Sequence, residues 1–111
     1  MKAPINPAIE PIVREFKVAL QDLYGDRLRD VILYGSYARG DYDDESDIDL
    51  MVVLGDEEVD TFREIRRMSE LETLFLLKYG IVISLLPSTT RRLQQSIMPI
   101  YDNVRREGLW L

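Results

Sequence analysis

The chain has 111 residues, of which 46% are hydrophobic and 31% charged, a composition typical of one folded domain and not of a disordered chain. It contains no cysteine and no histidine, which excludes disulfides, thiolate catalysis, histidine-dependent triads and metal sites built from either residue. The formal net charge of −6 disfavours stable binding to DNA or RNA, and the lack of a long apolar run or signal-peptide core favours a cytoplasmic protein without a membrane span.

A first helix is predicted between Asn6 and Tyr24, where apolar residues recur at helical spacing. Asn6 followed by Pro7 suits the start of a helix, but Pro11 has no amide hydrogen to donate, so the regular helix can also begin there. Gly25 then ends the helix.

Two apolar segments predict strands on either side of a polar loop. Val31–Tyr34 is a continuous apolar run, as in a strand covered on both faces, and Ile48–Leu54 is a second strand that Gly55 ends. The segment 35–47 between them is polar and contains glycine, so we expect a loop with room for one helical turn.

A long amphipathic helix is predicted from Glu58 to Tyr79, with Gly80 as its C-terminal cap. Its expected apolar stripe consists of Val59, Phe62, Ile65, Met68, Leu71, Leu74 and Phe75. A third strand, Ile81–Leu86, follows and is closed by Pro87. We expect the three strands to form the core together with the apolar stripes of helices.

The C-terminal segment predicts further helical structure. Ser88 or Thr89 can cap a helix, Pro99 interrupts it, and a last turn covers residues 103–107. The apolar tail Leu109–Leu111 either packs against the sheet, which we favour, or contacts a partner. The alternation of helices and strands predicts an α/β (α+β) domain.

Gly35–Ser36 directly follows the first predicted strand. Glycine permits a sharp turn and a close approach to a ligand, and the following amides and the serine hydroxyl can donate to phosphate oxygens. Such a pair is also common in plain turns, so by itself it leaves a plain turn and a phosphate-binding loop open.

Asp47 and Asp49 flank Ile48 at the start of the second strand. Because strand side chains alternate, both carboxylates point to one face, with Cα atoms roughly 6.6 Å apart. A divalent cation would relieve their repulsion and the cost of burial, and an oxygen-only ligand set suits magnesium. The alternative is an acidic strand entrance solvated by water, or Asp47 acting as a turn acceptor.

Ten residues separate Ser36 from Asp47, so a short connection can return both to the same edge of a sheet. Phosphate donors would then lie beside metal-binding carboxylates, which is the pairing that a nucleoside triphosphate with magnesium requires. The surroundings are strongly acidic, since ten acidic residues and no lysine or arginine fall between Asp41 and Asp60. Such a concentration repels nucleic-acid backbones and attracts cations.

The string LYGSYARGDYDDESDIDLMVV resembles the signature of the DNA polymerase β-like nucleotidyltransferase superfamily, in which G-S and a spacer precede D-x-D on a strand. The G-S-x10-D-x-D spacing and the short chain are similar to the minimal nucleotidyltransferases of prokaryotic HEPN–MNT toxin–antitoxin pairs. The resemblance is sharp over residues 33–53 and includes the C-terminal MPIYDNVRREG. It implies a polymerase β-like nucleotidyltransferase fold, a small mixed sheet flanked by helices, as one minimal domain over residues 1–111.

The resemblance also implies roles for particular residues. Gly35–Ser36 matches the phosphate-binding pair, and Asp47 and Asp49 match the catalytic, metal-binding acids. Arg39 lies where related proteins carry an arginine that assists the nucleotide, although an ion pair with Asp41 or Asp47 is an equally good interpretation.

One position departs from the pattern of active superfamily members, which usually add a third carboxylate on a later strand. The position expected to face the two acids is Ser84 in this chain, and serine does not hold a divalent ion as a carboxylate does. The enzyme then works with one metal ion and an acceptor supplied by its partner, or its catalysis is weak or lost.

The function implied by the resemblance is the transfer of AMP from Mg-ATP to a hydroxyl, expected to be a tyrosine, of a partner HEPN-type toxin, so that the protein acts as an antitoxin. The alternative is a weak or inactive enzyme that neutralises the toxin by stoichiometric binding. Transfer to a small molecule is disfavoured because 111 residues leave no room for an acceptor domain. The expected partners are ATP, Mg2+ and the toxin, and a homo-oligomer stays open.

Overall fold

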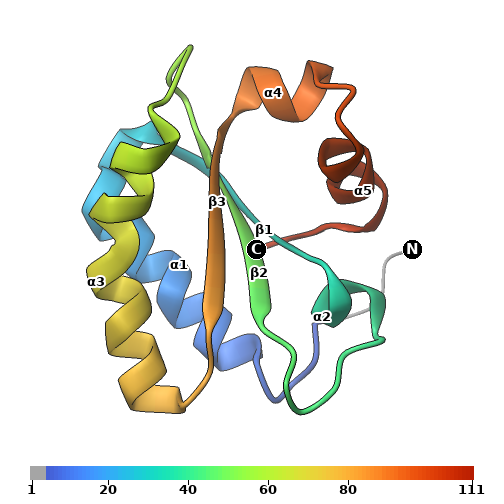
Figure 1. Cartoon of the computed structure of the whole chain (residues 1–111). Coiled ribbons are helices and arrows are strands. Elements are labelled where there is room, and N and C mark those ends of the chain that lie inside the picture. The colour runs from blue at the N-terminus through green and yellow to red at the C-terminus, as the bar shows by residue number, and fades with distance from the viewer. Residues whose placement is uncertain (1–4) are drawn as a thin grey trace.

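The protein folds as a four-stranded mixed sheet with helices on both faces (Figure 1), in a computed structural model that describes residues 5–111. The elements in chain order are α1 (Glu10–Tyr24), the 3-10 turn η1 (Gly25–Arg27), β1 (Leu28–Tyr34), α2 (Ser36–Arg39), β2 (Ile48–Leu54), α3 (Thr61–Tyr79), β3 (Ile83–Thr89), α4 (Thr90–Gln95), α5 (Pro99–Glu107) and β4 (Leu109–Trp110). Among the described residues, no helix is both long enough and apolar enough to cross a membrane.

The strands lie in the order β3-β2-β1-β4, so β2 and β1 are central. β1 runs antiparallel to β2 and to β4, whereas β2 and β3 are parallel. In this register Tyr34, Asp49 and Ser84 lie opposite one another on three adjacent strands. The sheet is therefore mixed, as the sequence predicts.

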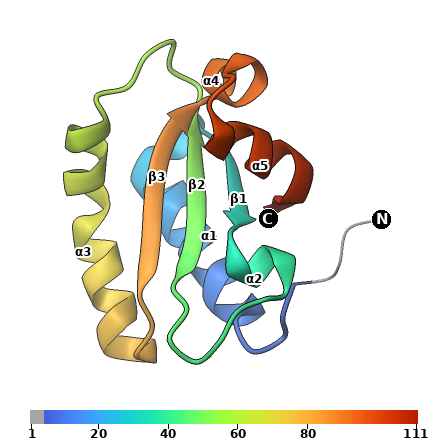
Figure 2. The ribbon, with the colours of Figure 1, turned by 45° about the vertical axis from the view of Figure 1, so that its right-hand side comes forward.

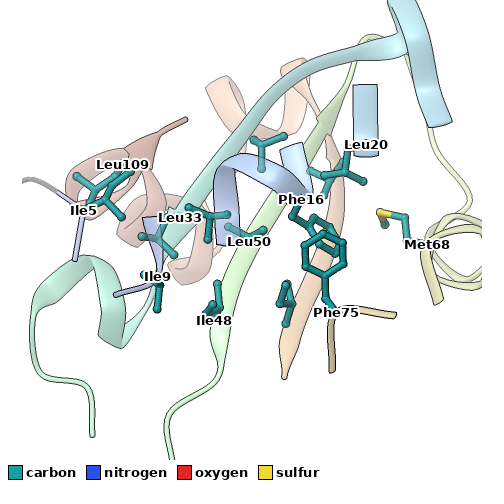
Figure 3. Packing of buried hydrophobic residues seen from close by; sticks show 14 of the residues in the cluster. Ile5, Ile9, Phe16, Leu20, Leu33, Ile48, Leu50, Met68, Phe75 and Leu109 are labelled. Carbon is teal, nitrogen blue, oxygen red and sulfur yellow. The ribbon is translucent and has the colours of Figure 1, made fainter. Parts of the chain in front are cut away.

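The helices α1 and α3 cover one face of the sheet, and α4 and α5 lie on the other (Figure 2). On the first face, the rings of Phe16 and Phe75 meet edge to face with their centroids 4.8 Å apart (Figure 3). On the second face, Met51 packs in a smaller cluster with Tyr101 and Val104 of α5. Each face of the two central strands is apolar because each is covered by helices.

The start of α1 combines the two predicted possibilities. Asn6 begins a turn, since its side-chain oxygen accepts a hydrogen bond from the amide of Ala8 at 2.8 Å and its carbonyl accepts one from the amide of Glu10 at 3.0 Å. The regular helix starts at Glu10 with Pro11 in its first positions, where an amide hydrogen is not needed.

Three strand boundaries differ from the prediction. β1 begins at Leu28, three residues before the apolar run. β3 begins at Ile83, two residues after the predicted start, and continues through Pro87 to Thr89. The amide of Ile48 donates to the carbonyl of Val82 at 3.0 Å, so the backbone of residue 82 faces β2. Backbone groups of a strand face its two edges at alternate residues, and the backbone of Pro87 therefore faces the free edge of β3. The expectation that proline closes this strand is wrong, because its missing amide hydrogen removes no bond to β2.

The predicted apolar stripe of α3 is only partly correct. Met68 and Phe75 are buried, but Phe62 is 77% and Leu74 is 53% exposed. Glu64 is instead 2% exposed, and its carboxylate forms ion pairs with two arginines. The helix thus buries a charged residue and exposes large apolar ones.

The C-terminal segment folds back over the sheet. The side chain of Thr89 caps α4 by accepting a hydrogen bond from the amide of Arg92 at 3.1 Å. Pro99 begins the separate helix α5 and does not interrupt α4, because proline is tolerated in the first turn. The tail forms β4, in which Leu109 is buried and pairs with Leu33, so it packs against the sheet as expected.

Candidate functional site

The turn between β1 and α2 is held by Gly35, whose backbone angles of φ 75° and ψ −153° lie in a region open essentially only to glycine. A Cβ atom at this position would lie 2.3 Å from the Oδ2 atom of Asp49. Glycine is thus required both by its backbone conformation and by the close approach of a neighbouring strand. The structure brings the loop and Asp49, which are far apart in the sequence, into direct contact.

The single helical turn α2 follows this glycine. Its last two amides, those of Ala38 and Arg39, donate to the carbonyl of Gly35 at 3.1 and 3.0 Å, and Gly40 ends the turn in the left-handed conformation. The first amides of such a turn have no partner within the helix and are available to an acceptor. The predicted loop with one helical turn therefore places the Ser36 hydroxyl and free amide donors beside Asp49.

The two aspartates lie at the start of β2. Asp49 is in register with Ser84 on β3, and Asp47 directly precedes the strand. The hydroxyl oxygen of Ser84 lies 3.5 Å from the Oδ2 atom of Asp47, so Ser84 faces the acids as the sequence predicts. Within residues 5–111, no group of three or more carboxylates is arranged to hold a metal ion.

The electrostatics of this cluster favour a cation. Burial raises the pKa of Asp49, the negative charge of Asp47 raises it further, and the positive charge of Arg39 opposes both. A divalent ion with oxygen ligands would offset these two costs, so the pair of carboxylates fits one such ion. Burial and the charge of Asp49 also raise the pKa of Tyr34 to about 12, which keeps its phenol protonated and able to donate.

Arg39 extends from α2 toward two carboxylates. Its Nε atom donates to Oδ2 of Asp41 at 3.1 Å, and its Nη1 atom lies 3.5 Å from Oε2 of Glu107 at the end of α5. The hydrogen bond to Asp41 is the largest cause that raises the pKa of this guanidinium. The ion pair predicted as an alternative therefore forms with Asp41 and not with Asp47.

These elements enclose an open pocket of about 560 Å³, a size within the range of small-molecule sites. Its lining consists of Tyr34, Gly35, Ser36, Arg39, Asp49, Ile100 and Asn103. Figure 2 shows α2 and α5, which supply most of this lining, on the same side of the sheet. Sequence reasoning missed Tyr34, Ile100 and Asn103 as site residues. For Ile100 and Asn103 the only available signal was their three-residue spacing on one helix.

The pocket combines two kinds of group. Hydroxyl, guanidinium and amide donors come from Ser36, Arg39 and Asn103, while the carboxylate of Asp49 lies among them. Donors alone suit an anion and carboxylates alone suit a cation, whereas a polyphosphate with a bound divalent cation uses both.

A family match and two similar proteins relate this chain to nucleotidyltransferases. The family described as "Nucleotidyltransferase domain" matches residues 13–101. Two Methanocaldococcus jannaschii proteins, both provisionally named protein adenylyltransferase, are similar to this chain. One is 40% identical over 100 residues, covering 89% of this chain and 93% of the relative, and the other is 42% identical over 73 residues, covering 66% and 72%.

Two solved structures share the fold. A toxin–antitoxin structure with AMP-PNP superposes with a TM-score of 0.60 at 21% identity, covering 86% of this chain and 69% of that chain. A Sulfolobus solfataricus protein provisionally named nucleotidyltransferase superposes with a TM-score of 0.57 at 23% identity, covering 95% and 86%. The predicted mixed sheet flanked by helices is therefore the fold of known nucleotidyltransferases.

Proposed function

The chain belongs to the nucleotidyltransferase domain family, and we propose that it transfers AMP from ATP to a hydroxyl of a partner protein. The observation that carries this proposal is the contact of the Gly35 turn with Asp49 inside one pocket. Support for adenylyl transfer to a protein comes from the names of the two archaeal relatives, which are about 40% identical to this chain.

Asp47 and Asp49 are the residues that would hold a magnesium ion in this proposal. Asp49 lines the pocket, and Asp47, which does not line it, is close enough for its charge to raise the pKa of Asp49. When bound, magnesium neutralises charge on the phosphate oxygens. The Ser36 hydroxyl and the first amides of α2 bind the terminal phosphates, and Arg39 adds a positive charge on the same side.

The transfer itself exchanges one bond for another. The acceptor hydroxyl oxygen forms a bond to the α-phosphorus on the side opposite the β-phosphate. The bond that joins the α-phosphorus to the β-phosphate breaks, and pyrophosphate leaves. The hydroxyl proton passes to the carboxylate of Asp49, since the chain contains no histidine.

We propose a tyrosine of a HEPN-type toxin as the acceptor, so that the protein acts as an antitoxin. The pocket is open on one side, which leaves access for an acceptor hydroxyl from a second protein. Similarity of the fold to a toxin–antitoxin protein with AMP-PNP supports this choice.

A second candidate function is stoichiometric neutralisation of the toxin without transfer. The observation that favours it is the hydroxyl of Ser84 at 3.5 Å from Asp47, where a third carboxylate would strengthen binding of a second metal ion. An inactive protein could still cover its partner, because complex formation does not need the missing ligand.

The test combines the purified chain, Mg2+, ATP labelled on its α-phosphate and a candidate HEPN-type toxin from the same organism. We expect label on a tyrosine of that protein with the wild type and none with the double variant Asp47→Asn, Asp49→Asn. The double variant Asp44→Asn, Glu45→Gln removes the same charge from the exposed loop and should still transfer label. Absence of label with the wild type contradicts transfer, and equal silencing of the toxin by the unlabelled Asp47, Asp49 variant supports the second function.

A further inference from the structure

We propose that helix α5 forms a wall of the nucleotide site, in which the Asn103 amide donates to the triphosphate and Glu107 positions Arg39. The inference rests on the proposed function, because it assigns residues to the binding of the same nucleotide. It adds two residues that neither the signature nor the spacing of the aspartates indicates.

The first step is the geometry of α5. Ile100, Asn103 and Glu107 are three and four residues apart, so they share one face of the helix. Ile100 and Asn103 line the pocket together with Ser36, and Glu107 reaches Arg39 at 3.5 Å. One helical face therefore lines the pocket through Ile100 and Asn103 and contacts the pocket residue Arg39 through Glu107.

The second step is the orientation of the Asn103 side chain. Its Oδ1 atom accepts a hydrogen bond from Nη2 of Arg106 at 2.8 Å, which leaves the two donors of the amide nitrogen. Within residues 5–111, this nitrogen makes no hydrogen bond, and the side chain is exposed at the pocket. Phosphate oxygens only accept hydrogen bonds, so a triphosphate is the part of a nucleotide that such a donor fits best.

The third step concerns the guanidinium of Arg39. Its Nε atom is bound by Asp41 and its Nη1 atom by Glu107, which leaves Nη2 for a ligand. The side chain of Asp41 is 61% exposed, whereas that of Glu107 is 28% exposed and belongs to a different element. Glu107 thereby restricts a long flexible side chain before the ligand arrives, which reduces the entropy lost on binding.

The fourth step is the rigidity of the wall. The hydroxyl groups of Tyr101 on α5 and Ser88 on β3 form a buried hydrogen bond of 2.6 Å. Arg105 donates to the carbonyls of Leu93 and Ser96 at 2.7 and 2.8 Å and so joins α5 to α4. A helix fixed in this way holds its pocket face at a constant distance from α2.

Isothermal titration with Mg2+ and AMP-PNP, and separately with AMP, tests the role of Asn103. Asn103→Ala should weaken binding of Mg-AMP-PNP about tenfold, the usual effect of losing a hydrogen bond to a charged group, and should leave AMP binding unchanged. Asn103→Asp should weaken it further, because a carboxylate has no donor and repels phosphate. Gln94→Glu makes the same change of amide to carboxylate on an exposed position of α4, outside the pocket, and should bind as the wild type does.

Glu107→Gln tests the positioning role through kinetics. We expect the KM for ATP to rise about fivefold with kcat unchanged, and the double variant Arg39→Ala, Glu107→Gln to match Arg39→Ala alone. A purely structural role would lower the thermal midpoint and add its effect to that of Arg39→Ala.

The outcomes separate the two proposals. Wild-type protein that binds no Mg-AMP-PNP overturns the proposed function and this inference together. Wild-type protein that binds and transfers, while Asn103→Ala binds Mg-AMP-PNP equally well, overturns only the inference. Equal losses for AMP and Mg-AMP-PNP would place Asn103 at the nucleoside or the α-phosphate and contradict a contact with the β- and γ-phosphates. Asn103→Leu, which keeps a side chain of similar size and removes the amide, replaces Asn103→Ala if that variant fails to fold.

Discussion

Gly35 determines both the backbone conformation of the turn after β1 and the space available to the Asp49 carboxylate. We expect Gly35→Ala to lower the free energy of unfolding by about 1–3 kcal/mol, because its backbone conformation is essentially restricted to glycine. Binding of Mg-AMP-PNP should also be lost, since the new Cβ would displace the Asp49 carboxylate. Urea titration and calorimetry measure the two effects.

Gly40→Ala provides the matched control. Gly40 also has a positive φ, of 89°, but a Cβ atom there would meet no atom within 4 Å. This variant should be destabilised by about 1 kcal/mol and still bind the nucleotide. Equal binding by the Gly35 and Gly40 variants would show that the contact with Asp49 does not matter for the site.

Asp49 illustrates the cost of a charged site to stability. Burial and the charge of Asp47 raise its pKa, so the folded protein holds the proton more tightly than the unfolded chain. Its contribution to stability therefore falls as the pH rises through the folded-state pKa. We expect Asp49→Asn without metal to be more stable at pH 7 by about 0.5 kcal/mol, a gain limited by solvent screening, and the difference to vanish below roughly pH 4.

Thermal denaturation in EDTA at several pH values measures this effect. Asp44→Asn removes one charge from the exposed loop and should leave stability nearly unchanged at every pH. An Asp49→Asn variant that is less stable than the wild type at pH 7 would contradict the cause assigned to the shift.

Among the secondary-structure elements, the short strand β4 has the clearest effect on the core. Leu109 is 7% exposed and belongs to the main hydrophobic cluster (Figure 3), whereas Trp110 on the same strand is 43% exposed. We expect Leu109→Ala to lower the free energy of unfolding by about 2–3 kcal/mol, the cost of a cavity at a buried leucine. The fluorescence of Trp110, the only tryptophan, reports unfolding in urea.

Trp110→Ala is the comparison within this strand. Because its side chain is largely exposed, we expect a loss below about 1 kcal/mol, measured by circular dichroism. If the Leu109 variant were as stable as the wild type but failed to bind its partner protein, the tail would be a contact surface and not part of the core.

The charge of the whole molecule bears on its partners. The net charge is −6. The loop 41–45 beside the site contains only acidic residues and one tyrosine, and every one of these residues is exposed. We expect no retardation of transfer RNA or duplex DNA at about 10 μM protein and physiological salt, because non-specific binding depends on neutralising phosphates with basic residues. Retardation that disappears with added salt would contradict this prediction.

Much of the local structure follows from contiguous residues. The alternation of side chains along β2 predicts that Asp47 and Asp49 share a face, and Ser84 was expected opposite them from the pattern of β3. The spacing between Ser36 and Asp47 likewise predicts that the loop and the acids meet at one edge. These predictions succeed because periodicity, turn chemistry and motif spacing are properties of short segments.

Other features depend on which surfaces meet after the chain folds. Glu64 is buried and Phe62 exposed because η1 and the end of β2 bring arginine and aspartate partners to one face of α3. Pro87 stays in β3 because that strand lies at an edge of the sheet. Asn103 reaches the pocket only because β4 pairs with β1 and draws α5 over it. The sequence by itself determined the fold class and the acids with their turn, since these are encoded locally. Tertiary structure alone decided that α5 lines the pocket, since packing between distant segments has no local signature.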